Sequence, residues 1–178
     1  MADAALSAAR AAGASYADLR IHRLTTEEIS LRDGELESSV LSREVGLAVR
    51  VIVDGTWGFA SHAELDPATA AETARRAVRV ATTLAPLNAE RIELAAEPVY
   101  SDLHWISGYV IDPFTVPGAD KIALLADYSQ RLLAADGVDH VSAHLQAVKE
   151  QTFYADTFGT STTQQRVRIL PTVEAVAV

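Results

Sequence analysis

The sequence predicts an α+β protein that combines about three helices with one or more largely antiparallel sheets. Extended segments with alternating apolar and polar residues occur in blocks, and Asp-Gly dipeptides typical of tight hairpin turns separate some of them. Helical patterns stand before and after these blocks, whereas a doubly wound parallel sheet would alternate single strands with helices. The grouping of the strands therefore favours α+β.

The N-terminal region predicts a short helix followed by a strand meander. Residues 3–12 are rich in alanine, and Gly13 can adopt the left-handed conformation that ends helices. Apolar and polar side chains then alternate over residues 19–22 and again over residues 28–32. Asp33 and Gly34 predict a turn into the next strand.

Residues 46–61 predict a hairpin more clearly than any other segment. Leucine and valine recur at every second position of its first half, and Asp54-Gly55 is a preferred two-residue turn. Trp57 and Phe59 fall on one face of the return strand. Two glycines inside these strands indicate a bulge or a close approach by another segment: Gly46 and Gly58.

The second half of the chain predicts two further helices and more strands. Asp66 is a typical helix cap, Pro67 suits the first helical position, and an apolar stripe (Ala70, Ala74, Ala77, Val78, Ala81 and Leu84) precedes Pro86. A third helix is expected over residues 120–135, with a core face formed by Ile122, Leu125, Ser129, Leu132 and Leu133. Strands are expected over residues 138–149, 152–155 and 165–169, with a turn near 156–159 and a polar run over 160–165.

Composition divides the chain into three parts. Residues 1–97 would form a first domain of helix, meander and helix. Residues 98–117 are a proline-rich linker with little regular structure. Residues 118–178 hold a helix and strands, which we expect to continue into a further C-terminal domain, because the last residues are β-branched and extended instead of polar.

Bulk properties predict a cytoplasmic protein. The chain has 178 residues, 49% of them hydrophobic, and no cysteine, so disulfides and thiolate metal sites are excluded. The first residues lack a secretory pattern, and no apolar run is long enough to span a membrane. A formal net charge of −9 argues against direct binding to nucleic acid.

No catalytic, cofactor-binding or metal-binding residue is predicted in this chain. His140 and His144 lie in a strand pattern, where positions i and i+4 are roughly 13 Å apart and do not easily share one ion. Ser61 and His62 are neighbours that point to opposite faces of a strand, which does not suit a nucleophile and its base. Four glutamates near strand ends are interpreted as solvent-facing charges: Glu27, Glu28, Glu35 and Glu37.

Three aromatic residues in or near the linker are predicted to contact a partner. Trp105, Tyr109 and Phe114 belong to an apolar stretch flanked by prolines. This chain has little core surface against which the stretch could be buried. We expect the stretch to pack on a downstream domain or on a second subunit.

The hairpin motif GLAVRVIVDGTWGFAS, over residues 46–61, resembles the first domain of the TldD/PmbA family. The similarity continues in Tyr16–Arg20, in Gly34–Glu37 and in Asp112–Phe114, and so it covers most of the chain. This family is described as zinc metallopeptidases and also as modulators of DNA gyrase.

The resemblance implies a parent protein that hydrolyses peptides with zinc held by an HExxxH motif. No histidine here is followed by glutamate, so we expect this chain to be an N-terminal piece, inactive alone, that serves as a scaffold, substrate-access or dimerisation domain. The family resemblance also implies subunits with and without the metal motif, and hence a homodimer or a heterodimer with a related subunit. The alternatives are a non-catalytic partner subunit and a stand-alone interaction module.

Overall fold

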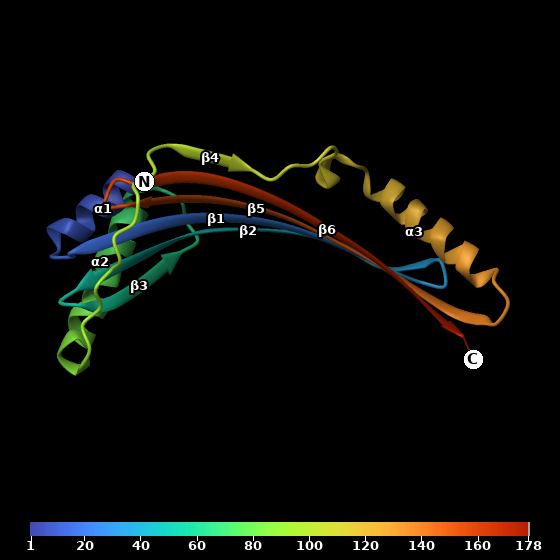
Figure 1. Cartoon of the computed structure of the whole chain (residues 1–178), viewed down its shortest axis with the longest axis horizontal. Coiled ribbons are helices and arrows are strands. Elements are labelled where there is room, and N and C mark those ends of the chain that lie inside the picture. Colours follow the sequence, from blue (N-terminus) through green and yellow to red (C-terminus); the bar gives the residue numbers. More distant parts are fainter. Residues whose placement is uncertain (178) are drawn as a thin grey trace. The chain divides into compact units, whose positions relative to one another are not determined.

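The computed structural model describes residues 1–177, and within them it has three α-helices and a six-stranded sheet (Figure 1). The helices are α1 (Ala2–Ala11), α2 (Pro67–Leu84) and α3 (Gly118–Leu133). The strands are β1 (Tyr16–Arg32), β2 (Glu35–Val53), β3 (Thr56–His62), β4 (Leu103–Ile106), β5 (Val138–Asp156) and β6 (Ser161–Ala177). Two short 3-10 helices cover Ala85–Leu87 and Pro113–Thr115. The predicted α+β class is confirmed.

The strands follow the order β3-β2-β1-β5-β6-β4 and are mostly antiparallel. β2 and β3 pair from Val53 with Thr56 to Leu47 with His62. Both predicted Asp-Gly turns are present, with positive φ at both residues: Asp33 and Gly34, and Asp54 and Gly55.

Two expectations about the strands are wrong. Residues 138–156 form one uninterrupted strand, and most of the polar run over 160–165 lies in β6, because pairing across the β5–β6 hairpin overrides local polarity. The proline-rich linker, which is not expected to be regular throughout, contains the short strand β4. The Ser107 amide donates to the Gln165 carbonyl (2.9 Å) beside it.

The described residues form two compact units, and each unit takes segments from three parts of the chain. Unit 1 contains Met1–Arg23, Val45–Trp105 and Gln151–Gln164. Unit 2 contains Leu24–Glu44, Ile106–Glu150 and the chain from Gln165 onward. Strands β1, β2, β5 and β6 contribute to both units, whereas composition divides the chain at residues 97 and 117.

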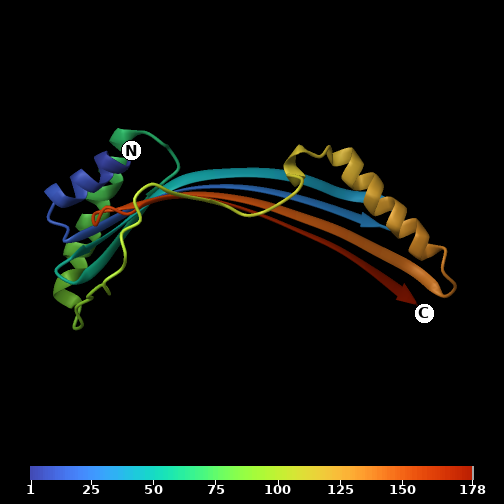
Figure 2. The ribbon, with the colours of Figure 1, turned by 45° about the horizontal axis from the view of Figure 1, so that its top comes forward.

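The core of unit 1 lies between the sheet and the helices α1 and α2, which are neighbours (Figure 2). Asp66 caps α2 as predicted, accepting from the amides of Ala68 (2.8 Å) and Thr69 (2.9 Å). The stripe on α2 is buried as expected except at its end, where Leu84 is exposed because the helix has passed beyond the sheet-facing core. The buried sheet residues include Leu19, Leu47, Val49, Val51 and Val53.

Gly58 shows the close approach that a glycine within a strand predicts. A Cβ atom there would lie 2.0 Å from the Ala77 carbonyl oxygen and 2.9 Å from the Ala81 Cβ atom, both on α2. Trp57 and Phe59 share the opposite face of β3, where Phe59 is exposed. The missing side chain of Gly58 therefore lets α2 pack directly on β3.

The core of unit 2 lies between α3 and the adjoining parts of β1 and β5. Its buried apolar residues are Ile29, Leu31, Leu125, Ala143, Leu145 and Ala147. Leu125 and Ser129 are buried on α3 as predicted, and so is Lys121, which the pattern did not include. Within residues 1–177, none of the helices is both long and apolar enough to cross a membrane.

Candidate functional site

A cluster of charged and aromatic side chains occupies the face of the unit 1 sheet opposite α1 and α2. Alternation along β1 turns Ala17 and Leu19 into the core and places Tyr16 and Asp18 on the other face. The Asp18 side chain is 1% exposed. Its Oδ2 atom accepts hydrogen bonds from Arg50 on β2, at 2.9 Å from Nε and 2.8 Å from Nη2. We call Tyr16, Asp18, Arg20, Arg50 and Tyr154 the Asp18 cluster.

Two tyrosine hydroxyls extend this cluster. The Tyr16 hydroxyl donates to Asp18 Oδ2 (3.1 Å) and lies 2.9 Å from the Tyr154 hydroxyl. The Tyr154 hydroxyl donates to Asp156 Oδ2 (3.0 Å). Burial raises the pKa of both tyrosines above the ordinary value. Both phenols are therefore neutral near pH 7, which suits binding and packing rather than proton transfer.

The two arginines of the Asp18 cluster also lie over aromatic rings. The Arg50 guanidinium carbon is 5.1 Å from the centre of the Trp57 ring, and that of Arg20 is 5.5 Å from the centre of the Tyr154 ring. Arg20 Nε is 3.9 Å from Asp18 Oδ1, a buried oxygen without a hydrogen bond. The hydrogen bond from Arg50 to Asp18 raises the pKa of Arg50, so this guanidinium stays charged.

A second polar arrangement lies in unit 2 and corrects one sequence interpretation. Glu27 does not face solvent: it is buried and forms an ion pair with the buried Lys121 ammonium of α3. The other three glutamates of that prediction are exposed. The alternation of β1 places Glu27 on the same face as Ile29 and Leu31, beneath α3, which the local charge pattern does not reveal.

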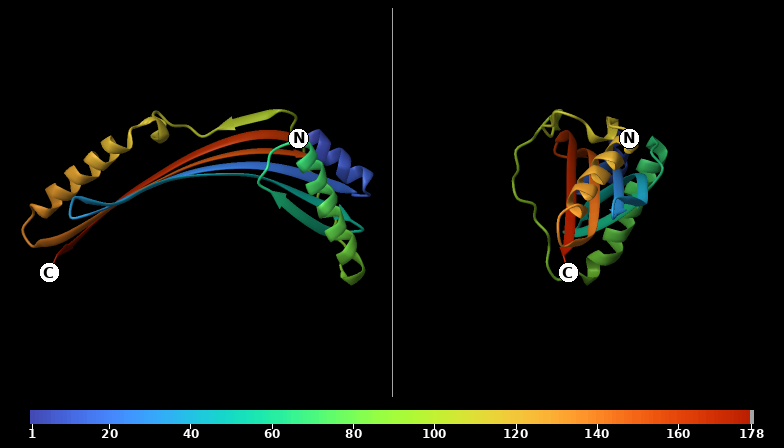
Figure 3. Two further views of the ribbon diagram at one scale, coloured as in Figure 1. Left: turned by 180° about the vertical axis from the view of Figure 1, so that it is seen from behind. Right: turned by 90° about the vertical axis from the view of Figure 1, so that its right-hand side faces the viewer.

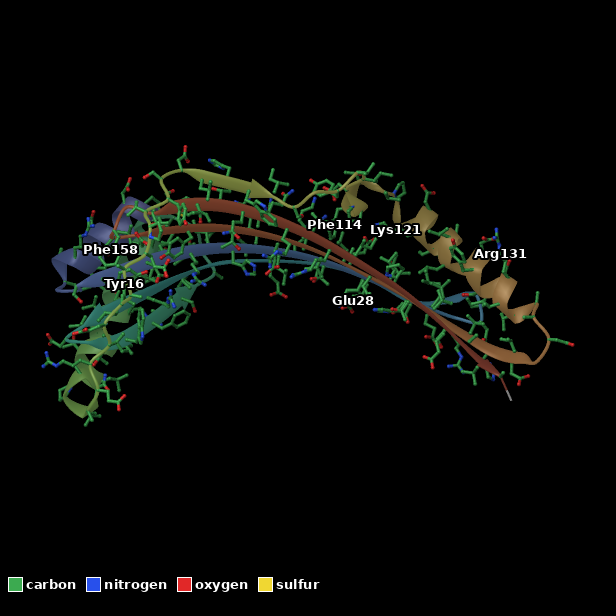
Figure 4. All side chains as sticks on the ribbon, in the orientation of Figure 1. Tyr16, Glu28, Phe114, Lys121, Arg131 and Phe158 are labelled. Atoms are coloured by element: carbon green, nitrogen blue, oxygen red, sulfur yellow. The ribbon has the colours of Figure 1, made fainter. Side chains whose placement is uncertain are left out.

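The structure places Phe114 among unit 2 side chains, close to this ion pair (Figure 4). Lys149 Nζ is 5.1 Å and Lys121 Nζ is 6.0 Å from the centre of its ring. Asp112 pairs with Lys149 and accepts from the Phe114 amide (3.0 Å). Phe114 is thus half-buried between two ammonium groups and the unit 2 core.

The other two predicted contact residues are more exposed. Trp105 lies in β4 and is 46% exposed, and Tyr109 is 42% exposed, with its hydroxyl accepting from Gln165 Nε2 (3.1 Å). Between and beyond them, Ile106, Val110 and Ile111 are exposed still further. Contact of these aromatic residues with a partner stays a prediction.

The residues described here do not fit a zinc ion. His140 and His144 lie in β5, and His140 Nδ1 is 3.0 Å from Asp33 Oδ2. Within residues 1–177, no group of three or more histidine, aspartate or glutamate side chains is arranged to hold a metal. No chemical step is therefore assigned to zinc in this chain.

The residue analysis missed the Asp18 cluster, although β1 carries a signal for it. Tyr16, Asp18 and Arg20 stand at every second position, so a strand places all three on one face. Their partners Arg50 and Tyr154 come from distant parts of the chain, and only the pairing of the strands brings them together.

Comparison with known proteins supports the family resemblance. Residues 17–81 match the sequence profile of PmbA/TldA metallopeptidase domain 1. A protein of Methanothermobacter thermautotrophicus named "Metalloprotease" is 25% identical over 171 residues, covering 91% of this chain and 34% of its own length. The chain thus spans about a third of that relative.

Solved structures share the fold at low sequence identity. A candidate modulator of DNA gyrase from Bacteroides thetaiotaomicron matches with a TM-score of 0.74 and 14% identity, over 99% of this chain and 40% of its own. A candidate gyrase modulator from Thermotoga maritima matches with a TM-score of 0.71 and 17% identity, over 99% of this chain and 39% of its own. TldE from Thermococcus kodakarensis matches with a TM-score of 0.66 and 15% identity, over 97% of this chain and 38% of its own.

The profile match includes β3, Gly58 and most of α2, and it contains Asp18 and Arg50 of the Asp18 cluster. The hairpin motif of residues 46–61, which first indicated the family, lies wholly within it. Over residues 17–81, this chain is therefore similar to the first domain of the TldD/PmbA family.

Proposed function

We propose that the chain is the N-terminal scaffold of a TldD/PmbA-like zinc metallopeptidase that degrades or processes peptides in the cytoplasm. In this proposal it contributes substrate access or dimerisation, and the zinc chemistry belongs to another part of the parent. The profile over residues 17–81 and the metalloprotease relative support the parent activity.

The observation that carries the scaffold role is the exposed apolar stretch that begins at the last residue of β4 and continues after it. Ile106, Tyr109, Val110 and Ile111 are large, close in sequence and all exposed. Contiguous apolar surface of this kind is characteristic of protein interaction sites, since its exposure to water is unfavourable. We assign it to contact with a further domain of the parent or with a second subunit, either identical or a related family member.

Purification of the native gene product from its source cells tests the proposal. The expected product is much heavier than 19.0 kDa, binds zinc, cleaves peptides and is a dimer in light scattering. A heavier product without zinc or peptide cleavage would instead identify a non-catalytic partner subunit. A product of 19.0 kDa would contradict the peptidase proposal and leave a stand-alone interaction module.

A further inference from the structure

A cavity of ≈320 Å³ lies in unit 1 beside the Asp18 cluster. The segment after α2 crosses the sheet on the side opposite α2, as the right-hand view of Figure 3 shows, and closes one side of the cavity. The volume is near the lower end for ligand sites, which suits one side chain or a small amine. The lining is aromatic and acidic: Tyr16, Tyr100, Tyr154, Phe158, Glu97 and Asp156.

Aromatic rings form much of the cavity wall. Phe158, in the β5–β6 turn, has its ring centre 5.3 Å from that of Tyr16, and Figure 4 shows the two residues close together. Phe158 is 59% exposed and Tyr100 is 49% exposed, so both rings remain open to a ligand. The face of an aromatic ring attracts cations through its quadrupole.

The polar groups of the cavity also favour a cation. The Tyr16 and Tyr154 hydroxyls contact each other and the Asp18 and Asp156 carboxylates, and their oxygen lone pairs can accept a hydrogen bond from a ligand. Asp156 is held in place because its Oδ1 atom accepts from the Phe158 amide (2.9 Å) and the Thr160 amide (3.0 Å). Within the described residues, Glu97 has no ion-pair or hydrogen-bond partner.

The charged groups of this region leave Glu97 as the carboxylate to be paired. Asp18 pairs with Arg50, and the Arg10 guanidinium donates to the Thr157 carbonyl beside Asp156. The same sheet face already holds the guanidinium groups of Arg20 and Arg50 over aromatic rings. A cation beside Glu97 would pair the remaining carboxylate of the cavity.

We propose that this cavity binds an organic cation the size of an arginine or lysine side chain, with its charge against Phe158, Tyr100 and Glu97. The ligand is a guanidinium or primary ammonium group on a short aliphatic stem. A basic side chain of a peptide and a free small amine are two sources of this chemistry. The cavity site does not depend on peptidase activity of the parent.

Calorimetric titration of the purified protein with N-acetylarginine methylamide tests the site. We expect saturable binding that is about 2- to 5-fold tighter than that of the neutral isostere N-acetylcitrulline methylamide, since a cation over partly exposed rings contributes about that factor. Methylguanidinium, added separately, distinguishes the sources. Equal binding of methylguanidinium supports a free cation at this site, and tighter binding of the arginine amide supports a peptide.

Two variants locate the binding. Phe158→Ala and Glu97→Gln are each expected to weaken it about 2- to 5-fold. Phe59→Ala, at another exposed aromatic residue of unit 1, and Glu93→Gln, in the same segment as Glu97, are matched controls. All four side chains are exposed, so the melting temperature of each variant should stay close to that of the parent chain.

The proposal is overturned if neither cation binds saturably, if the citrulline amide binds as tightly, or if Phe158→Ala and Glu97→Gln behave as their controls do. Such a failure leaves the mass, zinc and cleavage measurements on the native product unaffected. The cavity and the proposed function therefore fail separately.

Discussion

Asp18 is a buried carboxylate whose charged hydrogen-bond donor comes from another strand. An isolated carboxylate away from water is strongly unfavourable, and two charge-assisted hydrogen bonds from Arg50 offset much of that cost. The same guanidinium group lies over Trp57. Arg50 thus links β1, β2 and β3 on the sheet face away from the helices.

Replacement of Arg50 by methionine is expected to destabilise the protein by about 1.5–3 kcal/mol, because Asp18 keeps its burial and loses its charged donors. Urea titration measures the change. Arg75→Met is the control, since the exposed pair of Arg75 with Glu72 contributes about 0–1 kcal/mol. The double variant Asp18→Asn/Arg50→Met should lose less unfolding free energy than Arg50→Met alone. Equal losses for Arg50→Met and Arg75→Met would refute the role of Asp18.

Alkaline pH should destabilise the protein through Tyr16 and Tyr154. Their pKa values are raised in the folded state, whereas in the unfolded chain they lie near the usual value of about 10. Below about pH 10, both tyrosines keep their phenol protons in the folded protein and in the unfolded chain. Above it, the unfolded chain releases protons that the folded protein retains, so the free energy of unfolding falls as pH rises towards the folded pKa.

Urea titrations between pH 9 and 11 measure this slope. In Tyr16→Phe, the free energy of unfolding is expected to fall less steeply with pH than in the parent chain. Tyr100→Phe changes a half-exposed tyrosine and should leave the slope of the parent chain unchanged. A Tyr16→Phe slope identical to that of the parent chain would contradict the assignment.

Among the elements, the contact between β3 and α2 depends on the absence of one side chain. Gly58→Ala would place a methyl group against the Ala77 carbonyl, which must move. We expect a loss of about 1–3 kcal/mol or more, as for other overpacked cores. Gly108→Ala is the matched control, because nothing lies within 4 Å of its added Cβ atom. A melting temperature for Gly58→Ala equal to that for Gly108→Ala would show that α2 has room to shift.

The helix α3 is tied to β1 by the buried pair of Lys121 and Glu27. Lys121→Met should cost about 3–5 kcal/mol, because it leaves Glu27 buried without its countercharge. Hydrogen exchange should then accelerate in α3 before it does so in α2. Arg131→Met removes an exposed pair with Asp127 and serves as the control. Unchanged protection of α3 in Lys121→Met would show that the apolar contacts alone hold the helix.

For the whole molecule, the exposed stretch after β4 predicts assembly. In the native gene product, Val110→Glu and Ile111→Glu are expected to shift a dimer towards monomer, because they place charges in an apolar contact while touching little of the fold. Sedimentation velocity measures this. Phe114→Ser should instead lower stability, since Phe114 packs within unit 2. A dimer that withstands both glutamates would exclude this stretch from the subunit interface and leave only a contact within the parent.

Some features could be predicted from the sequence because their causes are local. Asp-Gly turns, the Asp66 cap and the alternation of residues 47–53 depend on neighbours within a few positions, and all three are confirmed. The family could also be recognised, because the motif over residues 46–61 is contiguous. The exact bounds of strands with polar residues could not be predicted, since β6 depends on pairing with β5.

The sequence by itself therefore determined the fold class, the turns, the helices and the family of the first domain, because propensity and side-chain period act over short distances. Only the tertiary structure decided which charges are buried and which aromatic residues gather around a cavity. The local pattern predicts Glu27 to be a surface charge, whereas α3 covers it, and Asp18 meets Arg50 and Tyr154 only through strand pairing. Such contacts join residues far apart in the chain, and no local pattern encodes them.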